Sequence, residues 1–247
     1  SSYYNTGWWG QEGKLEKNKR HKDIVSEIRN FLEKSFAYYN SSTEMDLKME
    51  SMEGVFSGDK NLYLHANYAK DIIDGINTCK EFNIKKIVLV GGEDSEKVIR
   101  EIKENNISVI LNRVHRLPKN EDSKIDEPFK QAKILSDNNI LFSFSYAGDM
   151  EAMGSRNLPF TAGTAVSYGL NYEQAIKALT LNTAKILGID KNLGSIEQGK
   201  EATFFISTDD ALDIMKNNVE HIFIKGEAID LENHQSKLYQ KYKERKN

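Results

Sequence analysis

Charged and polar side chains follow two short apolar runs, residues 107–111 and 140–145. These side chains are Arg113 and His115 after the first run, and Tyr146 and Arg156 after the second. Guanidinium, imidazole and phenol groups donate hydrogen bonds to carboxylates and other anions. If both runs are strands of one parallel sheet, the four side chains lie at one edge and can form an anion-binding pocket. Exposed charges on separate loops fit the pattern equally well, so both interpretations stay open.

His65 stands near the end of another apolar run, Asn61-Leu-Tyr-Leu-His-Ala. A neutral imidazole is a common ligand of zinc and other divalent metals, but zinc sites normally use three or four protein donors. The simpler interpretation of His65 is therefore a buried histidine that is hydrogen-bonded at the end of its strand. A metal ligand is the alternative.

Short apolar runs alternate with amphipathic segments through the middle of the chain. We expect strands at 62–65, 86–90, 107–111 and 140–145, with helices at 69–82, 95–104 and 129–136. Such alternation indicates an α/β fold with a parallel sheet and right-handed crossovers. Its carboxyl edge would also carry the following residues: Glu93, Asp94, Asn112, Arg116 and Glu151.

The flanking segments differ from this pattern. Residues 1–13 are aromatic and rich in glycine, which is typical of a loop, and helical periodicity appears over 14–39 and 46–56. After the core, apolar residues recur at helical spacing over 175–187, and Gly188 is placed to cap that helix. The sequence then predicts a short strand at 195–198, a buried strand at 202–206, and a hairpin through Lys225-Gly226.

The stretch from residue 172 to residue 207 resembles the amidohydrolase superfamily, in particular its imidazolonepropionase-like branch. That branch has a helix of the form A-x-x-x-x-T-x-N-x-A-x-x-L-G followed by L-G-S-I-x-x-G-K-x-A-D. The matching residues are Ala175, Thr180, Asn182, Ala184, Leu187, Gly188, Leu193, Gly194, Ser195, Ile196, Gly199, Lys200 and Ala202. Thr203 departs from the pattern, because the family usually has Asp there.

The resemblance implies that this α/β chain is the C-terminal half of a (β/α)8 TIM-like metal-dependent hydrolase barrel. Residues 61–190 would carry barrel strands five to eight, and 191–231 would be part of a small β domain. Residues 1–60 would be a loop and helices packed on the barrel, and 232–247 a C-terminal helix. Four parallel strands cut from a barrel have two open edges, so we expect the missing N-terminal half or another copy to complete them.

The resemblance also implies a divalent metal such as zinc, held by an H-x-H and by further His and Asp residues at the strand ends. His65 matches the fifth-strand ligand. Gly91 and Gly92 stand where the sixth-strand His is expected, and Tyr146 stands where the eighth-strand Asp is expected. Asp149 is the nearest carboxylate and the candidate catalytic base. Most of the metal ligands are thus not matched.

Composition narrows the classes of partner. The 247 residues carry 34 basic and 37 acidic side chains, spread along the chain, which gives no basic patch for nucleic acid. No apolar run reaches the ~18 residues needed to span a bilayer. The single cysteine indicates no disulfide framework and leaves the compartment open.

These observations favour an amidohydrolase-related protein that hydrolyses non-peptide carbon–nitrogen bonds in a small-molecule substrate. Two alternatives remain. The chain can be a degenerate barrel that binds a ligand without hydrolysing it, or one part of a split enzyme whose partner brings the H-x-H.

Overall fold

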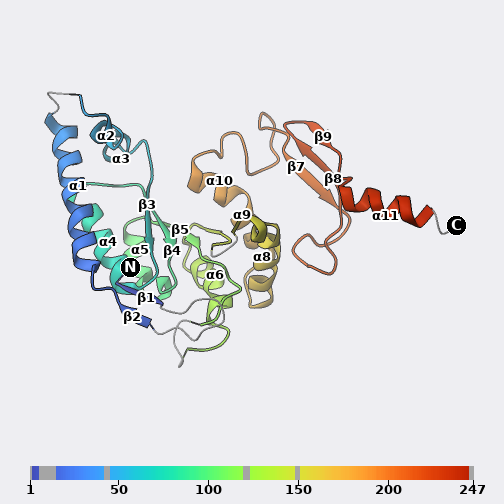
Figure 1. The fold of residues 1–247 in the computed structure, drawn as a ribbon, viewed down its shortest axis with the longest axis horizontal. Helices are drawn as coiled ribbons and strands as arrows, with labels where there is room; N and C mark the ends of the chain where they lie inside the picture. The colour runs from blue at the N-terminus through green and yellow to red at the C-terminus, as the bar shows by residue number, and fades with distance from the viewer. Residues whose placement is uncertain (1, 6–14, 42–44, 119–122, 148–150, 245–247) are drawn as a thin grey trace.

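The computed structural model describes residues 2–5, 15–41, 45–118, 123–147 and 151–244. Four strands form a parallel sheet in the order in which they occur along the chain: β3 (Leu62–Ala66), β4 (Ile87–Gly91), β5 (Ser108–Leu111) and β6 (Phe142–Phe144). The predicted parallel sheet is therefore confirmed, including the pairing of the last two strands. In Figure 1, α4 is drawn to the left of the labelled strands of this sheet and α6 and α8 to their right.

The crossovers share one turn, which occurs three times. Helices α4 (Ala69–Glu81), α5 (Ile99–Glu104) and α6 (Glu127–Asp137) each precede an Asn-Ile pair. The asparagines, Asn83, Asn106 and Asn139, have φ values of 54°, 49° and 56°. Asparagine tolerates this left-handed conformation, which ends a helix. Each following isoleucine is buried and starts the path into the next strand.

The two faces of the sheet are covered differently. Leu64, Leu89, Val109 and Phe142 are in register and share one face, and the last three are fully buried. That face packs on the helices, because a Cβ added to Gly75 of α4 would lie 2.6 Å from a Leu64 methyl carbon.

The opposite face carries His65, in register with Val90, Ile110 and Ser143. Tyr63 is on this face too and is 41% exposed. Parallel sheets are normally covered on both sides. We call this half-covered side the inner face.

The first sixty residues pack mainly through α1 (His21–Ser41) and two short helices, α2 (Leu47–Glu50) and α3 (Glu53–Ser57). Phe36 of α1 makes edge contacts with Phe56 and Phe82. Two expectations for this region were wrong. The helix begins at His21, because Leu15–Lys17 (β2) pairs with Tyr3–Asn5 (β1), part of the predicted loop. The expected helix at 46–56 is interrupted at residues 51–52.

The segment after β6 is helical: α7 (Glu151–Gly154), a 3-10 turn η2 (Ser155–Asn157), α8 (Leu158–Ser167), α9 (Tyr172–Leu179) and α10 (Leu181–Leu187). The expected single helix at 175–187 is wrong, because Thr180 has φ −123° and ψ −91° and separates α9 from α10. Its predicted end is correct: Gly188 caps α10 with φ 73°. α5 is likewise preceded by a 3-10 turn, η1 (Ser95–Val98).

The C-terminal part is a three-stranded antiparallel sheet of β7 (Phe204–Ser207), β8 (Val219–Ile224) and β9 (Glu227–Ile229). The hairpin through Lys225-Gly226 is confirmed, and both residues have positive φ, as a type I′ turn requires. The expected strand at 195–198 is absent, since the residues between Gly194 and Gly199 form no strand. β7 is not buried: Phe205 is 52% exposed.

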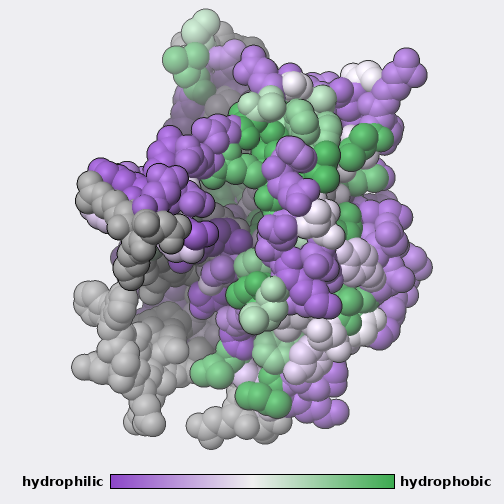
Figure 2. Space-filling model, turned by 90° about the vertical axis from the view of Figure 1, so that its right-hand side faces the viewer, coloured by the Kyte–Doolittle hydropathy of each residue, from purple (hydrophilic) through white to green (hydrophobic). Residues whose placement is uncertain are grey.

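Helix α11 (His234–Glu244) confirms the expected C-terminal helix and extends away from the small sheet (Figure 1). Figure 2 looks onto the side of the molecule that carries β7–β9 and α11, and apolar side chains are interspersed there with polar ones. Within the described ranges, no helix is both long enough and apolar enough to cross a bilayer.

Candidate functional site

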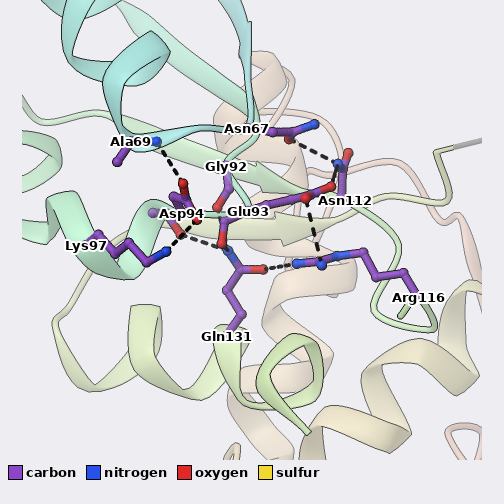
Figure 3. Close-up of polar contacts among 10 residues, drawn as sticks. Asn67, Ala69, Gly92, Glu93, Asp94, Lys97, Asn112, Arg116 and Gln131 are labelled. Carbon is purple, nitrogen blue, oxygen red and sulfur yellow. Dashed lines mark hydrogen bonds and ion pairs between the residues drawn. The ribbon is translucent and has the colours of Figure 1, made fainter. Parts of the chain in front are cut away.

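Three polar side chains meet where β3, β4 and β5 end. Asn112 follows β5, and its side-chain amide donates hydrogen bonds to Asn67 Oδ1 at 3.1 Å and to Glu93 Oε1 at 3.0 Å (Figure 3). Asn67 follows β3 and Glu93 follows β4, so this contact joins segments up to 45 residues apart. The carboxyl ends of parallel strands are where α/β folds place ligands.

The turn after β4 brings these groups together because it contains two glycines. Gly91 has φ 100° and Gly92 has φ 62°, conformations that side chains rarely adopt. A Cβ on Gly91 would also lie 2.2 Å from Asn67 Oδ1. Glycine at position 91 therefore permits the approach of the Asn67 amide to the end of β4.

Gln131 of α6 fixes the same turn from the helix side. It is 5% exposed, and its amide nitrogen donates to the carbonyl oxygens of Gly92 and Glu93 and to Ser95 Oγ. Its Oε1 accepts a hydrogen bond from Arg116 at 3.4 Å. One buried side chain thus connects the loop after β4 with the loop after β5 (Figure 3).

Asp94 connects that turn to the preceding helix. It is 8% exposed and accepts hydrogen bonds from the backbone N–H of Ala69 at 3.0 Å and from Lys97 Nζ at 3.0 Å. Its carboxylate lies at the first turn of α4, whose own N-cap residue, Tyr68, makes no side-chain capping bond. The hydrogen bond to Asp94 raises the pKa of Lys97.

We expect Asp94→Ala to lower the free energy of unfolding by about 1–3 kcal/mol, because it leaves the Ala69 N–H without its acceptor. Urea denaturation measures this change. The matched control is Asp74→Ala, on the exposed side of α4. Equal midpoints for the two variants would contradict the capping role.

A cavity of about 260 Å³ opens beside this network, lined by Glu93, Asn112, Arg113, Arg116 and Ala147. Arg116 faces a carboxylate, with 3.9 Å between its Nη1 and Glu93 Oε2. Arg113 has no carboxylate partner among the described residues, and its Nε is buried without a hydrogen bond. The guanidinium of Arg113 stacks on the Tyr146 ring instead, 5.4 Å from its centroid. Among the described residues that line the cavity, the positive charge of Arg113 is therefore not compensated.

Tyr146 is held in place by α7. A Cβ added to Gly154 would lie 1.9 Å from Tyr146 Cε1, so the ring lies directly against the Gly154 backbone. The ring thus contacts both that glycine and the Arg113 guanidinium, and the cation–π contact favours one orientation of the arginine.

The sequence profile of the Amidohydrolase family matches residues 28–229, most of the chain. The chain belongs to the amidohydrolase family. This match confirms the superfamily predicted from the helix and hairpin motif.

The branch is confirmed too. The chain is 27% identical over 238 residues to the imidazolonepropionase of Thermoplasma volcanium. This alignment covers 88% of this chain and 54% of that protein. It is 28% identical to an amidohydrolase from Thermotoga maritima of known structure, with a TM-score of 0.73, over 83% of this chain and 55% of the other. This amidohydrolase chain therefore spans about half the length of the relatives it matches.

A zinc-containing structure shares the fold. The adenosine deaminase from Xanthomonas campestris, solved with bound zinc, is 15% identical with a TM-score of 0.53, over 93% of this chain and 62% of that one. At this identity the likeness concerns the fold alone.

The structure brings some of the predicted anion-binding residues together. Arg113 and Tyr146 are in contact, whereas His115 lies beside α8, with its Nε2 2.6 Å from Thr164 Oγ1. Arg156 is exposed on η2 and does not line the cavity. Asp149, the candidate base, lies outside the described residues. The roles of all five residues stay predictions.

His65 does not have the surroundings that the simpler interpretation gave it. Its side chain is exposed on the inner face, so the expectation of a buried histidine is wrong. Within the described ranges, no cluster of three or more His, Cys, Asp or Glu side chains is placed to hold a metal ion. One exposed imidazole does not make a metal site. The described residues alone therefore do not fit the metal that the family implies.

The charge of Arg113 affects His115. Partial burial lowers the pKa of His115, and the nearby Arg113 lowers this pKa further. Below about pH 6.5 the unfolded chain then binds more protons than the folded chain. We therefore expect the free energy of unfolding to fall as the pH falls through this range. Urea denaturation at about pH 7.5 and about pH 5.5 tests this. An identical pH dependence in His115→Gln would contradict it.

The roles of Asn67 and Gln131 were not predicted from the sequence. Asn67 directly follows the β3 strand, and this position was the available signal for it. Gln131 has no such signal, because a glutamine within an amphipathic helix usually faces solvent.

Proposed function

We propose that β3–β6 are the fifth to eighth strands of an amidohydrolase barrel, with residues 61–190 as this half-barrel and 191–231 as part of a small β domain. The parallel order of the strands and the half-length match to relatives support the proposal. So does the inner face, on which Tyr63 and His65 are exposed. Another segment or another copy would then cover that face and pair with the edges of β3 and β6.

The completed protein, in this proposal, hydrolyses a non-peptide carbon–nitrogen bond in a small-molecule substrate that carries an anionic group. One observation supports an anionic group on the substrate. Arg113 lies at the carboxyl-edge cavity, stacked on Tyr146, and has no carboxylate partner in the described part of the chain. A carboxylate would accept charge-assisted hydrogen bonds from the free edge of this guanidinium. His115 and Arg156 would add positive potential around it.

Glu93 and Asn112 have a different role in this proposal. Their mutual hydrogen bond and the Arg116 contact fix the Glu93 carboxylate at the cavity wall. An anion would be repelled by Glu93 and directed toward Arg113, which orients a substrate that has one charged end. The chain's own contribution is then to bind and orient the substrate.

Binding without hydrolysis is the second candidate, and the strand ends favour it. Gly91, Gly92 and Tyr146 occupy positions where the family resemblance leads one to expect metal ligands. A split enzyme, whose other part brings the missing donors, accounts for the same observation.

Metal analysis and a hydrolysis assay of the completed protein separate these candidates. Stoichiometric divalent metal, together with turnover of a carbon–nitrogen substrate and loss of both in His65→Ala, would support the hydrolase. Absence of metal and turnover, with anion binding retained, would contradict hydrolysis and support binding alone. If anion binding is also absent, both candidates fail.

A further inference from the structure

A second cavity lies at the opposite end of the parallel sheet, where the strands begin. Its volume is about 550 Å³, and it is lined by residues 59–61, Tyr63, Lys86 and the end of α10. Three lysines contribute to its wall: Lys60, Lys86 and Lys185. All three side chains are exposed. We call this feature the basic cavity.

The wall of the basic cavity carries three lysines and one carboxylate, so its positive charge is only partly compensated. None of its three lysines forms an ion pair with another residue of the described ranges. The one carboxylate in its wall, Asp59, accepts a hydrogen bond from Ser57 at 2.6 Å. Three ammonium groups around one opening attract acidic groups and repel other basic ones.

The position of α10 shows which way the cavity faces. Asn182 donates to the Phe142 carbonyl at 3.3 Å, and Asn61 donates to the Ile186 carbonyl at 2.7 Å. α10 therefore lies across the sheet from β6 to the residue before β3. Tyr63, which also lines the cavity, belongs to the inner face. The basic cavity is thus continuous with the face that the proposed barrel leaves open.

We infer that the basic cavity docks acidic side chains of a polypeptide segment that completes the barrel and differs from this chain. The inference rests on the proposed half-barrel and decides between its two possible completions. In a barrel closed by two copies, all strands run parallel, so both basic cavities would meet at one end. Six lysines would then converge, and like charges at close range disfavour that pairing. A segment with acidic residues at the amino ends of its strands has the complementary charge.

A charge-reversed copy of the chain provides a defined acidic partner for the test. Lys60→Glu/Lys86→Glu/Lys185→Glu changes the formal net charge from −3 to −9, since each substitution removes one positive and adds one negative charge. A control variant, Lys22→Glu/Lys216→Glu/Lys241→Glu, has the same net charge, with the changes at exposed lysines away from the cavity. Thermal melts of both variants verify that each is folded.

Light scattering after size exclusion gives the outcome. We expect the wild type and the charge-reversed variant each to be monomeric alone, and to form a one-to-one complex when mixed at low salt. Raising the salt concentration to about 1 M should weaken that complex, because screening shortens the reach of exposed charges. The control variant should not associate with the wild type.

Three results would overturn the inference: self-association of the wild type, no complex in the mixture, or equal association with the control variant. Acetate binding by the same wild-type sample, measured in parallel, reports on the carboxyl-edge cavity. If no complex forms in the mixture but the wild type binds acetate, only the docking inference is rejected. If the wild type does not bind acetate, the proposed ligand site is rejected.

Discussion

Replacing Arg113 with glutamine is expected to weaken acetate binding by about 10- to 100-fold. A hydrogen bond to a charged group contributes about 1.5–3 kcal/mol, and about 1.4 kcal/mol corresponds to a factor of ten in affinity. Arg113 is the cation of the cavity without a carboxylate partner among the described residues, while Arg116 already faces Glu93. Calorimetric titration with acetate, and with uncharged acetamide as the matched ligand, measures the change.

The control for this experiment is Arg20→Gln, which makes the same charge change at an exposed arginine before α1. Arg113→Lys should bind with intermediate affinity, because an ammonium group keeps the charge but loses the planar stacking on Tyr146. An equal loss of affinity in Arg20→Gln would show that net charge, rather than the cavity, binds acetate. Full retention of affinity in Arg113→Gln would contradict the site.

Gln131→Met is expected to lower the free energy of unfolding by about 3 kcal/mol. The substitution keeps the length of the side chain but leaves the Gly92 carbonyl, Ser95 and one Arg116 donor without the amide. Each buried polar group that loses its partner costs about 1–3 kcal/mol. Because the free energy of unfolding of a domain is only about 5–15 kcal/mol, this loss should shift the urea midpoint strongly.

The same variant should also bind acetate more weakly, because the turn that holds Glu93 and the loop that holds Arg116 lose their shared contact. Gln240→Met, at an exposed position of α11, is the matched control and should behave like the wild type. An unchanged urea midpoint in Gln131→Met would show that the buried amide does not fix these loops.

The regular part of the fold could be predicted because local signals agree with tertiary structure there. Helix α4 and strand β4 follow from the spacing of apolar residues alone, and the Asn-Ile pairs after α4, α5 and α6 mark where each crossover returns to the sheet. Parallel pairing then follows from alternation, because each crossover carries the chain back to the same end of the sheet.

Errors arose where packing or backbone conformation overrides periodicity. The break at Thr180 occurs inside an unbroken apolar pattern, since α9 and α10 pack in different directions: α10 turns to cross the sheet toward Asn61. The apolar run at β7 resembles a buried strand, but Phe205 is exposed in the small sheet. Burial depends on what covers a strand, and periodicity does not report that.

The candidate site was predictable in part. The sequence places Arg113 and Tyr146 after two strands of one sheet, and their contact follows from that placement. The balance of charges in the cavity does not follow from that placement. It depends on the ion pair of Arg116 with Glu93, a pair that Arg113 does not form. Contacts such as that of Gln131 with Gly92, 39 residues away, exist only in the folded chain.

The most direct test of the proposed ligand site is the NMR signal of the Arg113 Nε–H during titration with acetate. We expect a saturable shift of this signal with acetate and none with acetamide, together with no shift of the Arg20 signal. A shift that is absent, or equally large for Arg20, would contradict the claim that the carboxyl-edge cavity binds an anion through Arg113.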